Sequence, residues 1–314
     1  KYFPKKKYKC TFVLLNIKHK AMKITITGSL GNIGKHLIGI LAEGGHEITV
    51  ISSSHDRISE IEQIGAKASI GSIMDVSFLT QSFYGADAAF LMTPPNIGGQ
   101  NIIENTVNVG RAYATAIKDS GLKKIVMLSS IGADFENGTG PIRGLHCIEE
   151  LYRAIEDISV TYLRAGYFYT NFYNDIPLIK NAGIEGSNFP AETRIPLVHP
   201  KDIAIAAADA LQTSNHGHQV HYIVSDYVTA SEIATELGKA VGKPDLPWVE
   251  FTDGQTLDGM QKAGLTAEIA QLYTEMGQAI RKGKLQSDYE IQGKPVNGQI
   301  KMKDFANEFA KKFL

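Results

Sequence analysis

A glycine-rich turn between an apolar segment and an amphipathic segment constrains the fold most strongly. The run Lys23–Thr27 predicts a strand, Gly28, Gly31 and Gly34 follow it, and the pattern after them predicts a helix. Such a turn aims unpaired backbone N–H groups and the positive end of the helix at a bound anion. A second predicted strand, His46–Ser52, completes the unit that this motif requires. The turn therefore predicts a dinucleotide-binding fold.

Strand-like segments alternate with helical patterns through the first half of the chain. Segments with the composition of buried strands lie at residues 66–70, 88–92, 124–129 and 159–164. Strands that alternate with helices in this way form a parallel sheet covered on both faces. The second half is less regular, and a capping box at Thr229–Glu232 opens one of its helices. We therefore predict an α/β fold, a doubly wound parallel (Rossmann) sheet with a smaller mixed α/β C-terminal lobe.

The same pattern suggests how the chain is divided. We expect residues 22–165 to form an NAD(P)-binding Rossmann domain, to which later strands and helices return from residues 200–224. Residues 166–314 are expected to form a small substrate or lid lobe over its binding crevice. Residues 1–21 are basic, with a short apolar run and no small-residue cleavage pattern after it. They indicate a disordered tail rather than a signal peptide.

The composition excludes several classes of protein. A net charge of −1 over 314 residues argues against direct binding of nucleic acid or of an anionic membrane. No run approaches the roughly 20 apolar residues that span a bilayer. Two cysteines cannot build a disulfide framework, which fits a cytoplasmic protein. His216, His218 and His221 have no cysteine or clustered acid beside them, and so indicate a polar loop rather than a metal site.

The end of the second predicted strand bears on the choice of cofactor. An acidic residue about 20 positions after the first glycine would bind the ribose hydroxyls of NAD. This chain has Ser52–Ser54 there, with Arg57 close by and Asp56 expected at a helix N-cap. Hydroxyl groups and an arginine tolerate a 2′-phosphate and can hydrogen-bond it. The pattern therefore favours NADP(H) over NAD(H), although Arg57 also fits a solvated residue in the first turn of a helix.

An ordered series of motifs resembles one known family. The motifs are Gly28-x-x-Gly31-x-x-Gly34, Gly45-His46-Glu47, Met92-Thr93-Pro94-Pro95, Ser129–Asp134, His146-x-x-x-Glu150 and Leu163–Phe168 with Asn171. Together they resemble the NmrA-like family of atypical short-chain dehydrogenase/reductases, over about residues 22–314. The resemblance implies a Rossmann domain that binds NAD(P)(H) under a small C-terminal lobe. Some members of the family resemble reductases of quinones or azo compounds, and others resemble redox-sensing regulators.

The resemblance also implies where a dinucleotide would lie. Its pyrophosphate would lie on the glycine turn, its 2′-phosphate after the second strand, its adenine after the third, and its nicotinamide near the sixth. Ser53 stands where relatives often carry arginine, which weakens the assignment of NADP. The cofactor-binding residues implied are Gly28, Ser29, Leu30, Gly31, Asn32, Ile33, Ser53, Ser54, Arg57, Ser72, Ile73, Met92, Thr93, Pro94, His146, Gly166, Tyr167 and Phe168.

The usual catalytic pair of short-chain reductases is absent from the expected place. These enzymes use Tyr-x-x-x-Lys, in which the lysine lowers the tyrosine pKa so that it can pass a proton to a carbonyl oxygen. With the candidate catalytic residue His146 at the lysine place, Ile142 stands at the tyrosine place, and the only match in the chain is Tyr2 with Lys6. Reduction of a quinone remains open because water can protonate the product.

Two further patterns have alternative interpretations. The spacing of His146 and Glu150 puts them on one helix face. The pair can be interpreted as a histidine oriented by a carboxylate or as a surface pair. The aromatic cluster at residues 167–173 fits a core or lobe interface, or a surface for stacking a flat acceptor.

Two functions are therefore expected. The first is a reductase that transfers hydride from NADPH to a quinone-like or other flat small acceptor. The second is a non-catalytic NAD(P) redox sensor that acts through a regulatory protein partner. Either protein could form a homodimer.

Overall fold

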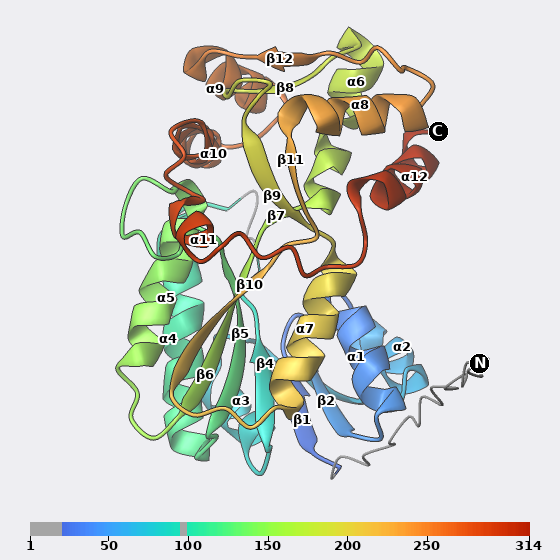
Figure 1. Cartoon of the computed structure of the whole chain (residues 1–314). Helices are drawn as coiled ribbons and strands as arrows, with labels where there is room; N and C mark the ends of the chain where they lie inside the picture. The colour runs from blue at the N-terminus through green and yellow to red at the C-terminus, as the bar shows by residue number, and fades with distance from the viewer. Residues whose placement is uncertain (1–20, 95–98) are drawn as a thin grey trace, which may run out of the picture.

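A parallel sheet forms the lower half of the molecule (Figure 1). The computed structural model describes residues 21–94 and 99–314. The seven strands are ordered β10-β6-β5-β4-β1-β2-β3, and every pair is parallel. They are β1 (Lys23–Ile26), β2 (Glu47–Ser52), β3 (Lys67–Ile70), β4 (Ala88–Leu91), β5 (Lys124–Ser130), β6 (Ser159–Ala165) and β10 (His218–Ile223). The predicted doubly wound parallel sheet is confirmed.

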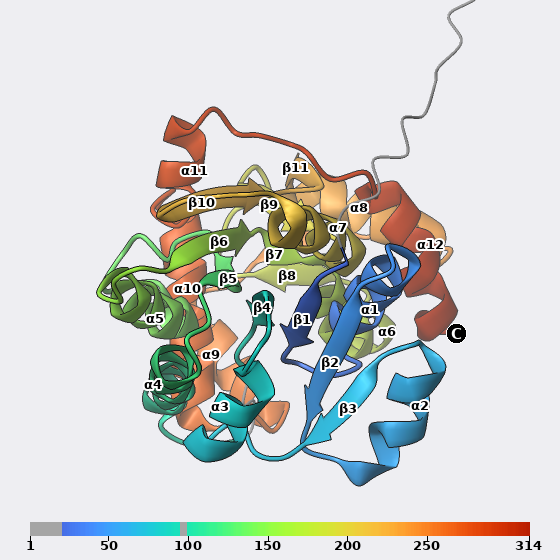
Figure 2. The same cartoon turned by 90° about the horizontal axis from the view of Figure 1, so that it is seen from below.

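Helices cover both faces of this sheet (Figure 2). On one face, Leu37 of α1 packs with Ala207 of α7 in a common core. On the other face, Tyr113 of α4 packs with Ile148 of α5. The helices are α1 (Gly34–Glu43), α2 (Ile58–Gln63), α3 (Val76–Phe83), α4 (Ile102–Ser120), α5 (Arg143–Arg153) and α7 (Pro200–Gln212), with short 3₁₀ turns η1 (His55–Arg57) and η2 (Gly140–Ile142).

The remaining elements form a second layer, which we call the cap, above the carboxyl end of the sheet (Figure 1). It contains a three-stranded sheet ordered β11-β9-β7 and a two-stranded sheet of β12 and β8. The strands are β7 (Tyr167–Phe168), β8 (Glu185–Ser187), β9 (Arg194–Val198), β11 (Asp226–Thr229) and β12 (Trp248–Glu250). The helices are η3 (Tyr169–Asp175), α6 (Ile176–Ala182), α8 (Ala230–Ala240), α9 (Asp253–Lys262), α10 (Ala267–Arg281), α11 (Ser287–Ile291) and α12 (Met302–Phe313).

The aromatic cluster belongs mainly to the core of the cap. Tyr169 is fully buried and stacks on Phe305 of α12, with ring centroids 5.1 Å apart. Tyr173 stacks on Phe309 in the same way at 6.0 Å. The predicted core role is therefore confirmed for these two tyrosines, whereas Tyr167 remains partly exposed.

Further predictions can be compared with the described residues. The capping box at Thr229 and Glu232 is confirmed at the start of α8. The predicted return of the chain to the sheet within residues 200–224 is made by α7 and by β10, which pairs with β6 along its whole length. The tail predicted for residues 1–21 lies, except for Ala21, outside the described residues. Among the helices that the structure describes, none is long and apolar enough to cross a membrane.

Candidate functional site

The glycine turn joins the carboxyl end of β1 to α1. Gly28 has a φ of +89°, and a Cβ atom there would lie 2.1 Å from Sδ of Met92. A Cβ atom on Gly34 would lie 1.9 Å from the carbonyl oxygen of Ser29. The fold itself therefore requires glycine at both positions. At Gly31 the nearest atom to such a Cβ is a backbone oxygen at 3.3 Å, so the fold does not exclude a side chain there.

The turn presents polar groups that can hold an anion. Helix α1 begins without a side-chain cap. In the described part of the chain, the N–H groups of Asn32 and Ile33 donate to no backbone carbonyl. The Ser29 hydroxyl is buried and has no hydrogen-bond partner within residues 21–94 and 99–314. Backbone donors at a helix start beside an unsatisfied hydroxyl fit the pyrophosphate of a dinucleotide.

Two residues that the sequence analysis missed hold Met92 beside the turn. The Met92 N–H donates to Oγ1 of Thr27 at 2.8 Å, and the Tyr113 hydroxyl donates to the Met92 carbonyl at 3.1 Å. Burial raises the pKa of Tyr113, which keeps its hydroxyl protonated as a donor. Thr93 is half-buried and Pro94 is exposed at the end of this segment. Of the candidate residues after β4, Met92 therefore lies next to the glycine turn.

The segment after β2 differs from the prediction in one detail. Ser54, and not Asp56, is the N-cap residue of η1, because its hydroxyl accepts the Asp56 N–H at 3.3 Å. The Ser54 side chain is therefore already engaged with the backbone. Ser53 and Arg57 are both exposed. They stay the predicted residues for a 2′-phosphate.

The candidate adenine residues follow the neighbouring strand β3. Ser72 is exposed, and its hydroxyl accepts the Met74 N–H at 3.1 Å. Ile73 is partly buried against the core formed by α3, α4 and α5.

His146 makes a different contact from the one predicted. Its Nδ1 lies 2.9 Å from the carbonyl oxygen of Ala133. Since a carbonyl only accepts, this contact assigns a proton to Nδ1 and leaves Nε2 of the neutral ring as an acceptor. The predicted pairing with Glu150 is wrong, because Glu150 instead pairs with Nε of Arg153 at 3.2 Å. His146 and Glu150 both line a groove of about 800 Å³ between α4 and α5.

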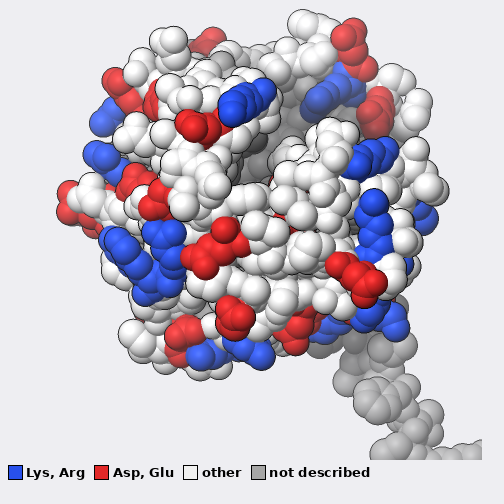
Figure 3. Space-filling model, turned by 90° about the horizontal axis from the view of Figure 1, so that it is seen from above, with Lys and Arg blue, Asp and Glu red and all other residues white. Residues whose placement is uncertain are grey.

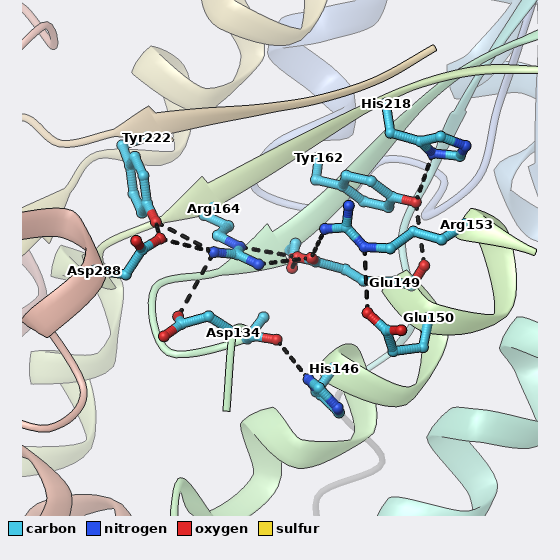
Figure 4. Close-up of polar contacts among 12 residues, drawn as sticks. Asp134, His146, Glu149, Glu150, Arg153, Tyr162, Arg164, His218, Tyr222 and Asp288 are labelled. Carbon is cyan, nitrogen blue, oxygen red and sulfur yellow. Dashed lines mark hydrogen bonds and ion pairs between the residues drawn. The ribbon is translucent and has the colours of Figure 1, made fainter. Parts of the chain in front are cut away.

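A buried ion pair joins β6 to α5, about one helical turn from His146 (Figure 4). Arg164 binds Glu149 with two parallel hydrogen bonds, from Nε at 3.1 Å and from Nη2 at 2.8 Å. The exposed fractions of the two residues are 5% and 1%. Ser129 and Arg153 also donate to the Glu149 carboxylate, at 2.6 and 3.1 Å. Desolvation lowers the pKa of Arg164, but the hydrogen bonds and charge of Glu149 outweigh it and raise the pKa.

Arg164 also links the sheet to the cap by hydrogen bonds. Its Nη1 donates to Tyr222 at 3.2 Å and to Asp288 of α11 at 3.1 Å. Asp134 lies 3.6 Å from it, and burial raises the pKa of that carboxyl. A second fastening lies at the start of α4, where the Glu268 carboxylate accepts two backbone N–H groups at 2.7 and 2.8 Å. These contacts hold α10 and α11 over the carboxyl end of the sheet.

The candidate nicotinamide residues lie where β6 passes into the cap. Gly166 is buried, and its N–H donates to the carbonyl of Ile223 at 3.0 Å. Tyr167 and Phe168 pair with β9 and remain partly exposed. The structure thus brings them to the junction of the sheet and the cap.

The three clustered histidines do not converge. His218 stacks on Tyr162 with ring centroids 6.0 Å apart, and its Nδ1 lies 3.1 Å from the tyrosine hydroxyl. His221 points to solvent on the edge strand β10. Within residues 21–94 and 99–314, no three histidine, cysteine or acidic side chains are grouped as a metal site requires.

Comparison with solved structures supports the fold. The NADPH-dependent quinone oxidoreductase of Escherichia coli, solved with NADPH, has a TM-score of 0.77 and 21% identity over 91% of this chain and 99% of that one. The triphenylmethane reductase of Citrobacter sp. has a TM-score of 0.76 and 19% identity over 92% and 99%. A nucleoside-diphosphate-sugar epimerase of Staphylococcus aureus has a TM-score of 0.74 and 16% identity over 91% and 100%.

No curated protein matches the chain significantly. The glycine turn, the parallel sheet and the cap nevertheless agree with a family assignment made from the sequence as a whole. The sequence model of the NmrA-like family matches residues 20–288, and the chain therefore belongs to this family.

Proposed function

We propose that this protein is an NADP(H)-binding reductase that transfers hydride to a quinone-like or other flat small acceptor. The anion-binding turn at the start of α1 carries this proposal, because its unpaired N–H groups and the Ser29 hydroxyl suit a pyrophosphate. Two of the similar structures, a quinone oxidoreductase and a triphenylmethane reductase, are described with NADPH and NADP(H). When bound, the dinucleotide supplies the hydride.

The residues of the chain would then bind and orient the dinucleotide. The turn from Gly28 to Ile33 would hold the pyrophosphate, and Ser53 with Arg57 would face the 2′-phosphate. Nε2 of His146 would accept a hydrogen bond from a ribose hydroxyl. Ile142, at the place of the usual catalytic tyrosine, is 8% exposed and has no proton to give. The proposal is therefore limited to acceptors whose reduced form can be protonated by water.

The reaction can be tested directly. The protein is mixed with NADPH and menadione, and the loss of NADPH absorbance is followed. We expect oxidation of NADPH that depends on both protein and quinone. A protein that binds NADPH but oxidises it with no member of a panel of quinones and azo dyes would instead be a redox sensor.

Replacing Ser53 with aspartate should reverse the choice of cofactor. The new carboxylate would repel a 2′-phosphate and accept hydrogen bonds from the two ribose hydroxyls of NADH. We expect the ratio of the NADPH and NADH dissociation constants to shift tenfold or more, which is about 1.4 kcal/mol. Ser59→Asp adds the same charge on α2 and should leave the ratio unchanged. An unchanged ratio in Ser53→Asp would mean that Ser53 does not face the ribose.

Replacing His146 with alanine should weaken cofactor binding and spare turnover. Loss of one hydrogen bond to the ribose should cost about 0.5–1.5 kcal/mol in NADPH affinity. Turnover at saturating NADPH should not show the ~10²-fold loss expected for a general acid. Titration of NADPH and steady-state kinetics with menadione measure the two effects. A large loss of turnover with unchanged affinity would make His146 a proton donor.

A further inference from the structure

Lys35 joins the helix after the glycine turn to the helix after β2. It lies in the first turn of α1, directly after Gly34. Its Nζ lies 3.2 Å from Oε1 of Glu60, which lies in the first turn of α2. The side chains of Lys35 and Glu60 are 61% and 51% exposed. An ion pair this exposed contributes little to stability, so Lys35 can exchange Glu60 for another anion at a small cost.

The topology of the sheet places this lysine near the residues predicted for a 2′-phosphate. Strands β1 and β2 are hydrogen-bonded neighbours, with Ile26 opposite Val50. The segments that follow the two strands therefore leave the carboxyl edge of the sheet about 5 Å apart. Arg57 is the N-cap residue of α2, three positions before Glu60, so their side chains lie on one side of the helix. Because Lys35 contacts Glu60, it approaches Arg57 to within about one helical turn.

Charges of both signs lie together after the end of β2. Lys35 and Arg57 are basic, Asp56 and Glu60 are acidic, and all four side chains are exposed. Asp56 also accepts a hydrogen bond from the Ser54 hydroxyl at 3.4 Å. The four charges cancel, so a phosphate is attracted here only if the cations lie closer to it than the carboxylates do. A movement of the Lys35 side chain away from Glu60 would meet this condition.

The surface above the cap also mixes charges of both signs. Seen from above, Lys and Arg side chains lie among Asp and Glu side chains instead of forming one basic area (Figure 3). The net charge of the whole chain is −1. A long-range field therefore gives a phosphate little preference for this side of the protein. Selection of a 2′-phosphate must come from the side chains that contact it.

We propose that Lys35 is a second cation for the 2′-phosphate of NADP(H), and that Glu60 holds this lysine when no phosphate is bound. A phosphate monoester carries about −1.5 to −2 charges at pH 7, so it attracts an ammonium group more strongly than the single carboxylate of Glu60 does. Lys35 would approach the phosphate from α1, and Arg57 would approach it from α2. The inference rests on the proposed function only for the choice of cofactor and does not depend on hydride transfer.

The test uses two probes that differ only in the 2′-phosphate. These are adenosine 2′,5′-bisphosphate and adenosine 5′-monophosphate, and isothermal titration calorimetry with the full chain measures their dissociation constants. We expect the wild type to bind the bisphosphate about tenfold more tightly or better. Lys35→Met keeps most of the apolar stem and should lower this preference about tenfold, with little change in the affinity for the monophosphate. The preference for NADPH over NADH should fall by the same factor.

A second variant, Glu60→Gln, tests the exchange of partners. Release of Lys35 should raise the preference for the bisphosphate by about two- to fivefold, which is the range of an exposed ion pair. In a Lys35→Met background the same change should leave the preference nearly unchanged, because Glu60 then has no lysine to hold. An equal gain in both backgrounds would mean that Glu60 only repels the phosphate, and it would overturn the exchange.

Matched controls are Lys67→Met and Glu62→Gln, which remove exposed charges at the start of β3 and on α2. Both should leave the preference for the bisphosphate unchanged. Equal binding of both probes by the wild type, or a preference that Lys35→Met leaves unchanged, would overturn the role of Lys35, whatever menadione does. A preference that depends on Lys35, without oxidation of NADPH by any acceptor, would retain this role and reject the reductase.

Discussion

Replacing Glu149 with alanine should lower the free energy of unfolding by about 3 kcal/mol. The change would leave the buried Arg164 charge without its two-hydrogen-bond partner and leave the Ser129 hydroxyl without an acceptor. Removal of one partner of a buried ion pair costs about 3–5 kcal/mol, because the other charge stays buried. We expect the lower end, since Asp288 still contacts Arg164 at 3.1 Å.

The neighbouring residue provides the control. Glu150 lies on the same helix and forms an ion pair with Arg153, but its side chain is 59% exposed. Glu150→Ala should therefore cost less than about 1 kcal/mol, as is usual for a surface ion pair. Urea unfolding followed by circular dichroism compares the two variants. An equal loss in both would mean that the Arg164–Glu149 pair contributes no more than an exposed one.

The sheet could be predicted from the sequence because its signals are local. Strands β1, β4, β5 and β6 are buried on both faces and therefore appear in the sequence as short apolar runs. The turn between β1 and α1 requires glycine at Gly28 and Gly34, which marks it in the sequence. The strands of the cap have two to five residues and lie far from their partners in sequence. Segments this short show no alternation of apolar and polar residues, so nothing in the sequence predicted β7 or β8.

The polar contacts of the site were harder to predict than its backbone. The spacing of His146 and Glu150 predicted a shared helix face, and both do line one groove. Their side chains do not pair, because Glu150 forms an ion pair with Arg153, one turn further along. A charged partner at i+3 is a stronger attraction for a carboxylate than a histidine that already contacts a carbonyl.

Contacts between side chains far apart in the sequence could not be predicted from local sequence patterns. Arg164 is one of many basic residues in the sequence, and only the packing of β6 on α5 selects Glu149 for it. The cofactor assignments of Ser53, Arg57 and Tyr167 stay predictions, because they depend on a ligand whose position the chain alone does not define.

Replacing Gly31 with valine should abolish dinucleotide binding and keep the fold. The φ of Gly31 suits any residue, and its added Cβ would meet only a backbone oxygen at 3.3 Å. The branched side chain would occupy the space in which a pyrophosphate approaches the N–H groups of Asn32 and Ile33. Hydrogen bonds to a charged group contribute about 1.5–3 kcal/mol each, so loss of two should weaken NADPH binding by a factor of roughly 100 or more.

Two other glycines of the same segment separate binding from folding. Gly39 lies inside α1 with no atom within 4 Å of an added Cβ, so Gly39→Val should retain both the fold and NADPH affinity. Gly34→Ala should instead destabilise the protein itself, because its Cβ would lie 1.9 Å from the Ser29 carbonyl oxygen. Fluorescence titration with NADPH and the melting temperature without cofactor distinguish these cases. If Gly31→Val bound NADPH as tightly as Gly39→Val, the turn would not be the phosphate-binding site, and the proposed function would lose the observation that carries it.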